Sequence, residues 1–191
     1  MQVVCLKGSP RIRGNSSALA DALCERMLDK GAEVLSWNLN ELSFRGCQAC
    51  YLCKTELETC ALEDDLTPVL DAVRSCDVLV LATPVYFSDV SAQTKAFIDR
   101  TFSFLHADYQ SAERPGRLEP GKRLVFIQAQ AHPDRNQFRD IYSRYSTYFI
   151  WNGFRESEFL RACGFQEPGE AARDPELLQH VEELAEKMTT P

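Results

Sequence analysis

The chain has 191 residues, 45% of them hydrophobic and 26% charged, a composition typical of one globular domain and not of a disordered or fibrous chain. Against 28 Asp and Glu stand 21 Lys and Arg, so the net charge is −7; this argues against nucleic-acid binding, which needs a basic surface. No apolar run could span a membrane and no signal peptide is recognisable, so we expect a cytoplasmic protein. Eight cysteines in that setting indicate metal, redox or catalytic use before disulfides.

The predicted elements alternate between strands and helices in chain order. An apolar strand at 3–6 precedes a helix at about 17–30, whose apolar residues recur with helical spacing and which Gly31 terminates. The further strands are expected at 33–39, 77–82, 124–127 and 159–163. The further helices are expected at 66–75, 91–105, about 138–149 and 175–188.

This alternation predicts an α/β fold of the flavodoxin-like, doubly wound type. Five parallel strands in the order 2-1-3-4-5 would carry helices on both faces, because right-handed crossovers return each strand to the sheet. We expect a single domain over 1–191, with a Cys-rich loop insertion at about 44–65. Ligands of such folds bind at the carboxyl ends of the strands, which directs attention to the loops that follow them.

The loop after the first strand, GSPRIRGNSS at 8–17, contains two Gly, one Asn, three Ser and two Arg. Free backbone N–H groups at a helix N-terminus attract anions, and hydroxyl and guanidinium groups add hydrogen bonds to phosphate. The loop is neither a Walker A sequence nor a dinucleotide-binding Gly-x-Gly-x-x-Gly. We therefore predict a phosphate site here; the alternative is an ordinary loop with a Ser or Asn cap.

The loop after the third strand, TPVYFS at 83–88, is expected to begin where Thr83 and Pro84 end that strand. Its apolar side chains and backbone N–H groups suit the face and the edge of a flat heteroaromatic ring. The alternative is a β-turn with two incidentally buried aromatic residues.

Four cysteines with the spacing C-x2-C-x2-C-x6-C lie in the insertion after the second strand. They are Cys47, Cys50, Cys53 and Cys60. Four such thiolates can ligate a [4Fe–4S] cluster or a zinc ion, and free or redox-active thiols remain a third possibility. We expect this loop on the same edge of the sheet as the phosphate loop. The other cysteines are expected to be buried as small hydrophobic residues: Cys5, Cys24, Cys76 and Cys163.

These segments together resemble the NADPH-dependent FMN reductase and iron–sulfur flavoprotein group of the flavodoxin-like superfamily. The resemblance is carried by GSPRIRGNSSALA at 8–20, by ATPVYFSDVSAQTKAFIDR at 82–100 and by the cysteine loop. It extends more weakly to GFRESEFLRACGFQEPGE at 153–170.

The resemblance implies tightly bound FMN. Its phosphate would be held by Ser9, Arg11, Asn15, Ser16 and Ser17. Its ribityl chain and isoalloxazine would be lined by Pro84, Val85, Tyr86, Phe87 and Ser88. The segment 128–132 would approach the ring from the other side. A [4Fe–4S] centre would lie near FMN at a subunit interface of a homodimer or homotetramer.

The predicted function is that of an FMN-dependent oxidoreductase or electron carrier of the iron–sulfur flavoprotein type. Electrons would pass between a donor (NAD(P)H or a ferredoxin), FMN and the cluster, and no protein acid or base is assigned as catalytic. One alternative is a cluster-free NAD(P)H-dependent quinone, nitro or FMN reductase. The others are a non-enzymatic electron-transfer or redox-sensing module and a zinc-binding protein on a doubly wound scaffold.

Two further features are interpreted structurally. The acidic run at 63–65 is expected to mark a helix N-terminus and not a metal site. An aromatic stripe on the fifth predicted helix is expected to pack in the core or at a subunit interface. It comprises Tyr142, Tyr145, Tyr148 and Phe149.

Overall fold

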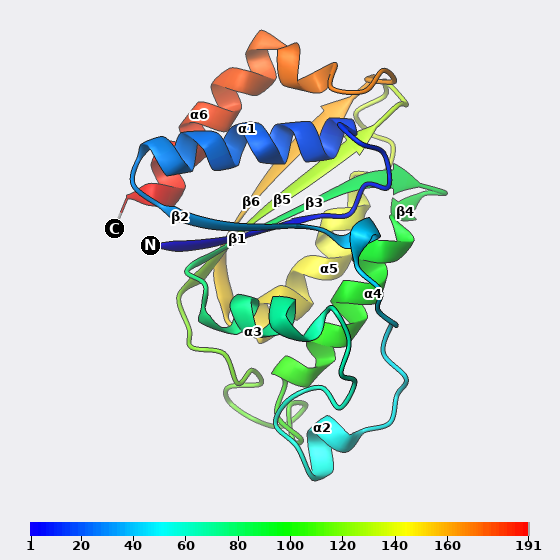
Figure 1. Ribbon diagram of the computed structural model, residues 1–191, viewed down its shortest axis with the longest axis vertical. Coiled ribbons are helices and arrows are strands. Elements are labelled where there is room, and N and C mark those ends of the chain that lie inside the picture. Colours follow the sequence, from blue (N-terminus) through cyan, green and yellow to red (C-terminus); the bar gives the residue numbers. More distant parts are fainter. Residues whose placement is uncertain (191) are drawn as a thin grey trace.

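The computed structural model describes residues 1–190 and confirms the doubly wound architecture (Figure 1). Five parallel strands follow the order β2-β1-β3-β5-β6, which is the predicted 2-1-3-4-5 once the short extra strand β4 is set aside. The strands are β1 (Gln2–Lys7), β2 (Glu33–Asn38), β3 (Val78–Tyr86), β4 (Asp89–Val90), β5 (Lys122–Gln130) and β6 (Phe154–Cys163).

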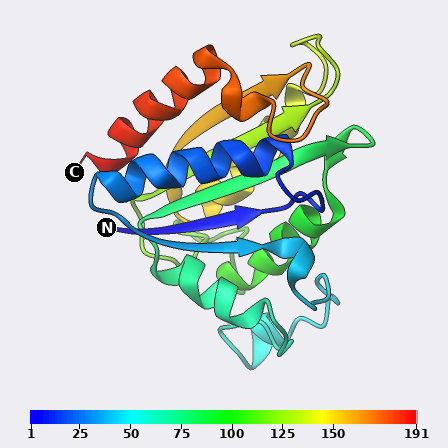
Figure 2. The ribbon, with the colours of Figure 1, turned by 45° about the horizontal axis from the view of Figure 1, so that its top comes forward.

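Helices cover both faces of the sheet, as Figures 1 and 2 show. One face carries α1 (Asn15–Asp29) and α6 (Pro175–Thr189). The other carries α3 (Thr67–Ser75), α4 (Ala92–Arg100) and α5 (Asp140–Trp151). The remaining helical pieces are α2 (Leu52–Thr55), η1 (Leu39–Glu41), η2 (Thr101–Phe104) and η3 (Ala171–Arg173). Within residues 1–190, no helix is both long enough and apolar enough to cross a membrane.

Each central strand is apolar on both faces and so supplies two cores. On β1, Val3 and Cys5 pack toward α1 and α6, whereas Val4 and Leu6 pack toward α3 and α4, because successive side chains alternate across a strand. Burial on both sides explains why the inner strands read as continuous apolar runs.

Three of the four cysteines expected in the core are buried, and Cys163 is partly exposed. A hydrogen bond to Cys5, together with burial, raises the pKa of the Cys24 thiol. Burial raises the pKa of Cys76 to about 12, so these thiols stay protonated at neutral pH.

The stripe on α5 divides into two parts. Tyr145 and Phe149 are buried, and Tyr142 stacks on Phe159 with ring centroids 4.7 Å apart, which confirms core packing. Tyr148 differs, because 52% of it is exposed.

The end of the third strand differs from the prediction. β3 continues through Thr83 and Pro84 to Tyr86, because the antiparallel pairs with β4 give it partners beyond the proline. Phe87 and Ser88 form the turn of this hairpin with φ of 50° and 68°. Positive φ at both central residues is what a two-residue hairpin turn requires.

Two helix boundaries also differ. α1 begins at Asn15, earlier than expected, and the helix predicted at 91–105 is α4 followed by the tighter turn η2. Gly31 has φ +84°, in agreement with its predicted terminating position.

Candidate functional site

A pocket of about 290 Å³ opens at the carboxyl ends of β1, β3 and β5, between the loops that follow them. Predicted residues contribute half of its lining: Ser9, Arg11, Asn15, Pro84, Val85 and Tyr86. The last two residues of β5, Ala129 and Gln130, and the following Ala131 also line it, in the region expected to approach from the other side. Gly14, Phe165 and Gln166 complete the lining.

The loop between β1 and α1 is closely packed against the N-terminus of α4. Gly8 continues the ladder by donating its N–H to the Ala82 carbonyl over 2.8 Å. A Cβ on Gly8 would lie 1.8 Å from the Thr94 Oγ1, so only glycine fits there. Ser91, the N-cap of α4, donates its hydroxyl to the Gly8 carbonyl over 2.6 Å and receives the Thr94 N–H. Ser91 and Thr94 therefore support the loop, a contribution that the helix signal alone did not reveal.

The N-terminus of α1 has the features of an anion site. Its N-cap is Gly14, which has no capping side chain, and its first turn has no acidic residue. The first N–H groups of a helix have no partner within the helix and carry partial positive charge. Ser16 is 1% exposed, and its hydroxyl has no hydrogen-bond partner among the described residues. A buried hydroxyl without a partner costs free energy until a ligand supplies one.

Asn15 uses its side-chain amide within the protein. It donates to the Phe165 carbonyl over 3.2 Å and accepts from the Ala171 N–H over 3.0 Å, so it ties α1 to the segment after β6. Arg11 donates to the Gln166 carbonyl over 3.1 Å from an exposed position. The segment 165–166 thus forms a wall of the pocket; Gly164, with φ +88° after β6, is the sequence feature that marks this turn.

Two pairs of predicted residues lie outside the pocket lining. Ser16 and Ser17 are buried in the first turn of α1 and are not among the residues that line the pocket. Phe87 and Ser88 form the hairpin tip, where the Phe87 ring is fully exposed. The hairpin is held to α5 by Asp89, which accepts the Tyr145 hydroxyl over 2.9 Å.

The four motif cysteines line one small enclosed cavity with Arg100 and Phe102. Cys53 is buried, Cys60 is half-buried, and Cys47 and Cys50 are exposed. Among the described residues, no group of three potential ligands is spaced to hold a single metal ion.

This cavity does not lie at the edge of the sheet where it was expected. It lies against the end of α4 and the η2 turn, and α2 is far from the β3–β4 hairpin in Figure 1. The prediction assumed that the cysteine segment stays near the carboxyl end of β2, which it follows in the sequence. The chain instead runs along α4, where three cationic side chains hydrogen-bond backbone carbonyls and join the segment to α4 and η2.

Arg100 is the first of these cations, and its side chain is 0% exposed. It donates to both carboxylate oxygens of Asp64, at 2.7 and 3.2 Å, and to the carbonyls of Arg45 and Leu62 at 2.8 and 3.1 Å. It thus joins the two ends of the cysteine segment. Burial opposes ionisation of Asp64, but hydrogen bonds from Arg100 and from the Arg45 N–H outweigh it and lower the pKa of this carboxyl.

Lys54 and Arg117 hold the middle of the segment. Lys54 donates to the Phe102 and Leu105 carbonyls at 2.5 and 2.6 Å, and burial lowers its pKa. Arg117 donates to the Cys53 carbonyl over 2.9 Å. Sequence reasoning missed these three cations. The acidic run does precede α3 as expected, and the Asp64 Oδ1 accepts the Leu66 N–H over 3.1 Å, but the ion pair of Asp64 with Arg100 was not foreseen.

The strand order and the pocket beside the first strand define the class of doubly wound α/β proteins with a ligand site at the topological switch point. Residues 1–188 match the family described as having a flavodoxin-like fold, and the chain belongs to that family. The predicted family and fold class are therefore confirmed.

Relatives and solved structures agree with this family. The chain is 35% identical over 106 residues to an iron–sulfur flavoprotein of Archaeoglobus fulgidus, which covers 56% of this chain and 48% of the relative. It is 34% identical over 101 residues to one of Methanocaldococcus jannaschii, covering 53% of this chain and 52% of the relative. These alignments span about half the length of the relatives.

Two solved structures cover the whole chain. An NAD(P)H:quinone oxidoreductase from Methanothermobacter marburgensis superposes with a TM-score of 0.75 at 18% identity, over 100% of this chain and 98% of that one. An FMN-dependent NADH-azoreductase from Bacillus anthracis, in complex with FMN, gives 0.71 at 16% identity, over 100% of both chains. At these identities the likeness shows a shared fold.

Proposed function

We propose that the protein is an FMN-dependent oxidoreductase of the iron–sulfur flavoprotein type. It would move electrons between a reduced donor (NAD(P)H or a ferredoxin), FMN at the switch-point pocket and a [4Fe–4S] cluster on the cysteine segment. The names of the relatives and of the solved structures support this class.

The observation that carries the FMN assignment is the unpartnered, buried hydroxyl of Ser16 at the uncapped N-terminus of α1. A phosphate there would accept hydrogen bonds from this hydroxyl and from the N–H groups of the first helical turn. Ser9 and Arg11 line the switch-point pocket, which reaches Gly14 and Asn15 at the start of this turn, and would add further donors, whereas Asn15 would brace the helix. The residues present therefore fit a phosphate ester.

The other residues that line the pocket are of the types that suit a flavin ring. Apolar residues of β3 (Pro84, Val85) and of the segment 129–131 line it, together with Tyr86. Its volume of about 290 Å³ is near the lower end of the range of ligand pockets. Bound FMN supplies hydride and electron transfer, and the protein contributes binding, orientation and exclusion of water.

The cluster assignment is supported by the donor set and its surroundings. Four thiols line one cavity whose wall includes the buried guanidinium of Arg100. The Arg100 Nε has no hydrogen-bond partner among the described residues. A buried cationic donor beside thiolates stabilises their negative charge, and hydrogen bonds to the sulfurs tune a cluster's reduction potential.

The decisive experiment is anaerobic purification of the full chain, followed by a visible spectrum and by flavin, iron and sulfide analysis. We expect one FMN, four iron and four sulfide per chain. A protein that contains FMN but no iron would refute the cluster and favour the alternative of a cluster-free NAD(P)H-dependent reductase. Stoichiometric zinc in a colourless protein would refute both assignments.

A variant tests the phosphate site separately. Ser16→Ala removes one hydrogen bond to a charged group, worth about 1.5–3 kcal/mol, so the Kd for FMN should rise roughly 10- to 150-fold. The matched control is Ser143→Ala on the exposed side of α5, which should bind FMN as the parent does. An unchanged Kd for Ser16→Ala would exclude this loop as the phosphate site.

We also propose that the protein forms a homodimer or homotetramer. The fully exposed Phe87 ring at the hairpin tip supports this together with the neighbouring Tyr86, which is 42% exposed, because aromatic residues are enriched at protein interfaces. Analytical ultracentrifugation should give a mass of two or four times 21.6 kDa, and Phe87→Ser should lower it. A monomeric parent would contradict this proposal.

A further inference from the structure

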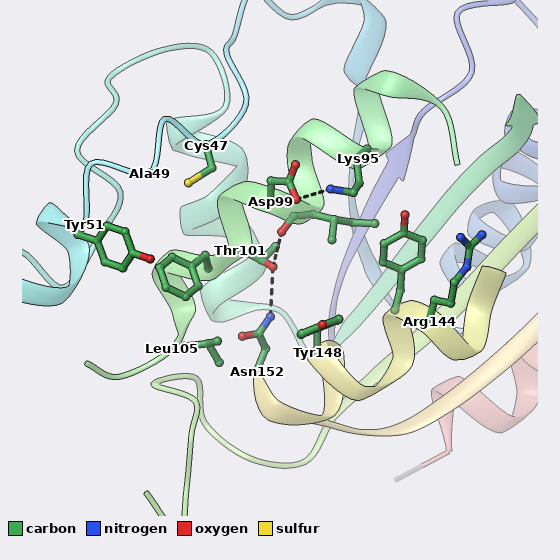
Figure 3. A pocket seen from close by; sticks show the side chains of 13 residues that line it. Cys47, Ala49, Tyr51, Lys95, Asp99, Thr101, Leu105, Arg144, Tyr148 and Asn152 are labelled. Atoms are coloured by element: carbon green, nitrogen blue, oxygen red, sulfur yellow. Dashed lines mark hydrogen bonds and ion pairs between the residues drawn. The ribbon is translucent and has the colours of Figure 1, made fainter. Parts of the chain in front are cut away.

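A second, larger pocket lies away from the switch point. Its volume is about 630 Å³. Its walls come from α4 and η2, from α5 and from the beginning of the cysteine segment (Figure 3). It shares no lining residue with the switch-point pocket. We call it the α4–α5 groove. Its size is within the range of small-molecule sites.

The walls of the α4–α5 groove are aromatic and apolar. Tyr51 and Phe102 meet edge to face at one end, with ring centroids 5.9 Å apart, and Tyr148 projects from α5 (Figure 3). Tyr51 and Tyr148 are 59% and 52% exposed. Exposed rings that converge on one concavity are typical of sites for a planar apolar molecule.

The groove also contains an unsatisfied acceptor. Asn152 is 2% exposed and donates its Nδ2 to the Thr101 Oγ1 over 3.3 Å. The single hydroxyl hydrogen of Thr101 is used toward the Ile98 carbonyl, 2.7 Å away, so Thr101 can only accept from Asn152. This fixes the amide orientation and leaves the Asn152 Oδ1 as an acceptor that has no partner among the described residues.

The charged groups of the groove do not favour an ionic ligand. Lys95 is 2.6 Å from Asp99, and Arg144 lies 3.4 Å from both Asp89 and Asp140. Because each cation already has a carboxylate partner, an anion gains little here. The groove is therefore suited to a neutral molecule with an aromatic face and one hydrogen-bond donor.

We propose that the α4–α5 groove binds a hydroxylated aromatic molecule of the phenol or hydroquinone class, whose O–H donates to the Asn152 Oδ1 and whose ring packs on Tyr148 and Phe102. This binding requires neither FMN nor a cluster. Cys47 also lines the groove, so an occupant would lie beside the cysteine segment. A role of this molecule in electron transfer rests on the proposed function, whereas its binding to the groove does not.

The test is a calorimetric titration of the full chain with two matched probes, 1-naphthol and 1-methoxynaphthalene. They share the ring, but only 1-naphthol has a donor for Asn152. We expect 1-naphthol to bind about ten-fold more tightly, as one hydrogen bond to a buried acceptor predicts. Equal Kd values, or no saturable binding of either probe, would overturn the proposal.

Variants locate the binding. Asn152→Ala should remove the preference for 1-naphthol and leave the affinity for 1-methoxynaphthalene unchanged. Tyr148→Ala should weaken both probes alike, whereas Ile150→Ala, exposed on the same helix but outside this groove, should bind as the parent does. If the parent binds neither probe and Tyr148→Ala alters its sedimentation, the groove is a contact between copies and the proposal is wrong.

Discussion

Arg100 is the residue whose loss tests the structure of the cysteine segment most directly. Arg100→Leu removes four hydrogen bonds, two to Asp64 and one each to the carbonyls of Arg45 and Leu62. The leucine fills part of the space but leaves a largely buried carboxylate without its cation. The two ends of the segment then lose the group that joins them.

The magnitude follows from the burial of the pair. Removing one partner of a buried ion pair costs about 3–5 kcal/mol. Asp64 keeps the N–H groups of Arg45 and Leu66 and is 14% exposed, so we expect the lower end, about 3 kcal/mol. For a chain of this length each kcal/mol lowers Tm by about 2–4 °C, which gives a decrease of roughly 6–12 °C.

The assay is urea unfolding of the protein without cofactors, followed by circular dichroism, with Tm as a second measurement. Arg26→Leu is the matched control: its partner Glu182 is 41% exposed, and a surface pair contributes at most about 1 kcal/mol. Alkylation of the buried Cys53 and the half-buried Cys60 should also accelerate in Arg100→Leu only. A loss equal to that of the control would refute the idea that Arg100 holds the segment.

Three further outcomes are expected. Because the pKa of Asp64 is lower in the folded chain than in the unfolded one, its ionised form stabilises the fold above about pH 4, and this is lost as the pH falls through the folded pKa. The stability gap between parent and Asp64→Asn in urea should therefore shrink on acidification; a constant gap would contradict this. Cys50→Ser should abolish iron incorporation and leave the FMN content intact, as measured by metal and flavin analysis; unchanged iron would exclude this ligand. Gly8→Ala should cost about 1–3 kcal/mol and weaken FMN retention, since its Cβ would meet Thr94 at 1.8 Å. An unaltered Tm and Kd would show that the loop moves freely.

The sheet and its pocket could be predicted because their determinants are local. Apolar runs buried on both faces mark the inner strands, and their alternation with helices limits the strand order to few choices. The carboxyl ends of those strands then bring Ser9, Arg11 and Pro84 together, although they are far apart in the sequence.

The setting of the cysteine segment could not be predicted in the same way. Spacing shows that four thiols can converge, and they do line one cavity. Their location depends on Arg100, which ends an ordinary helical pattern, and on Asp64, which lies 36 positions earlier. No local pattern distinguishes such a pair from surface charges. The extension of β3 past Pro84 was missed for a related reason, because its partner strand has only two residues.

Helix α4 has a consequence for how the protein can vary. Its N-cap Ser91 is bonded to the loop after β1, and its last residue, Arg100, is bonded to the cysteine segment. Nine residues make a spacer about 13 Å long in which each residue turns about 100°. One inserted residue would lengthen the spacer by only about 1.5 Å but would swing the guanidinium by about 100° away from Asp64. The length of α4 therefore fixes the orientation of Arg100 relative to Ser91 and thus joins the two sites in one geometry. Insertions and deletions are expected only outside this helix.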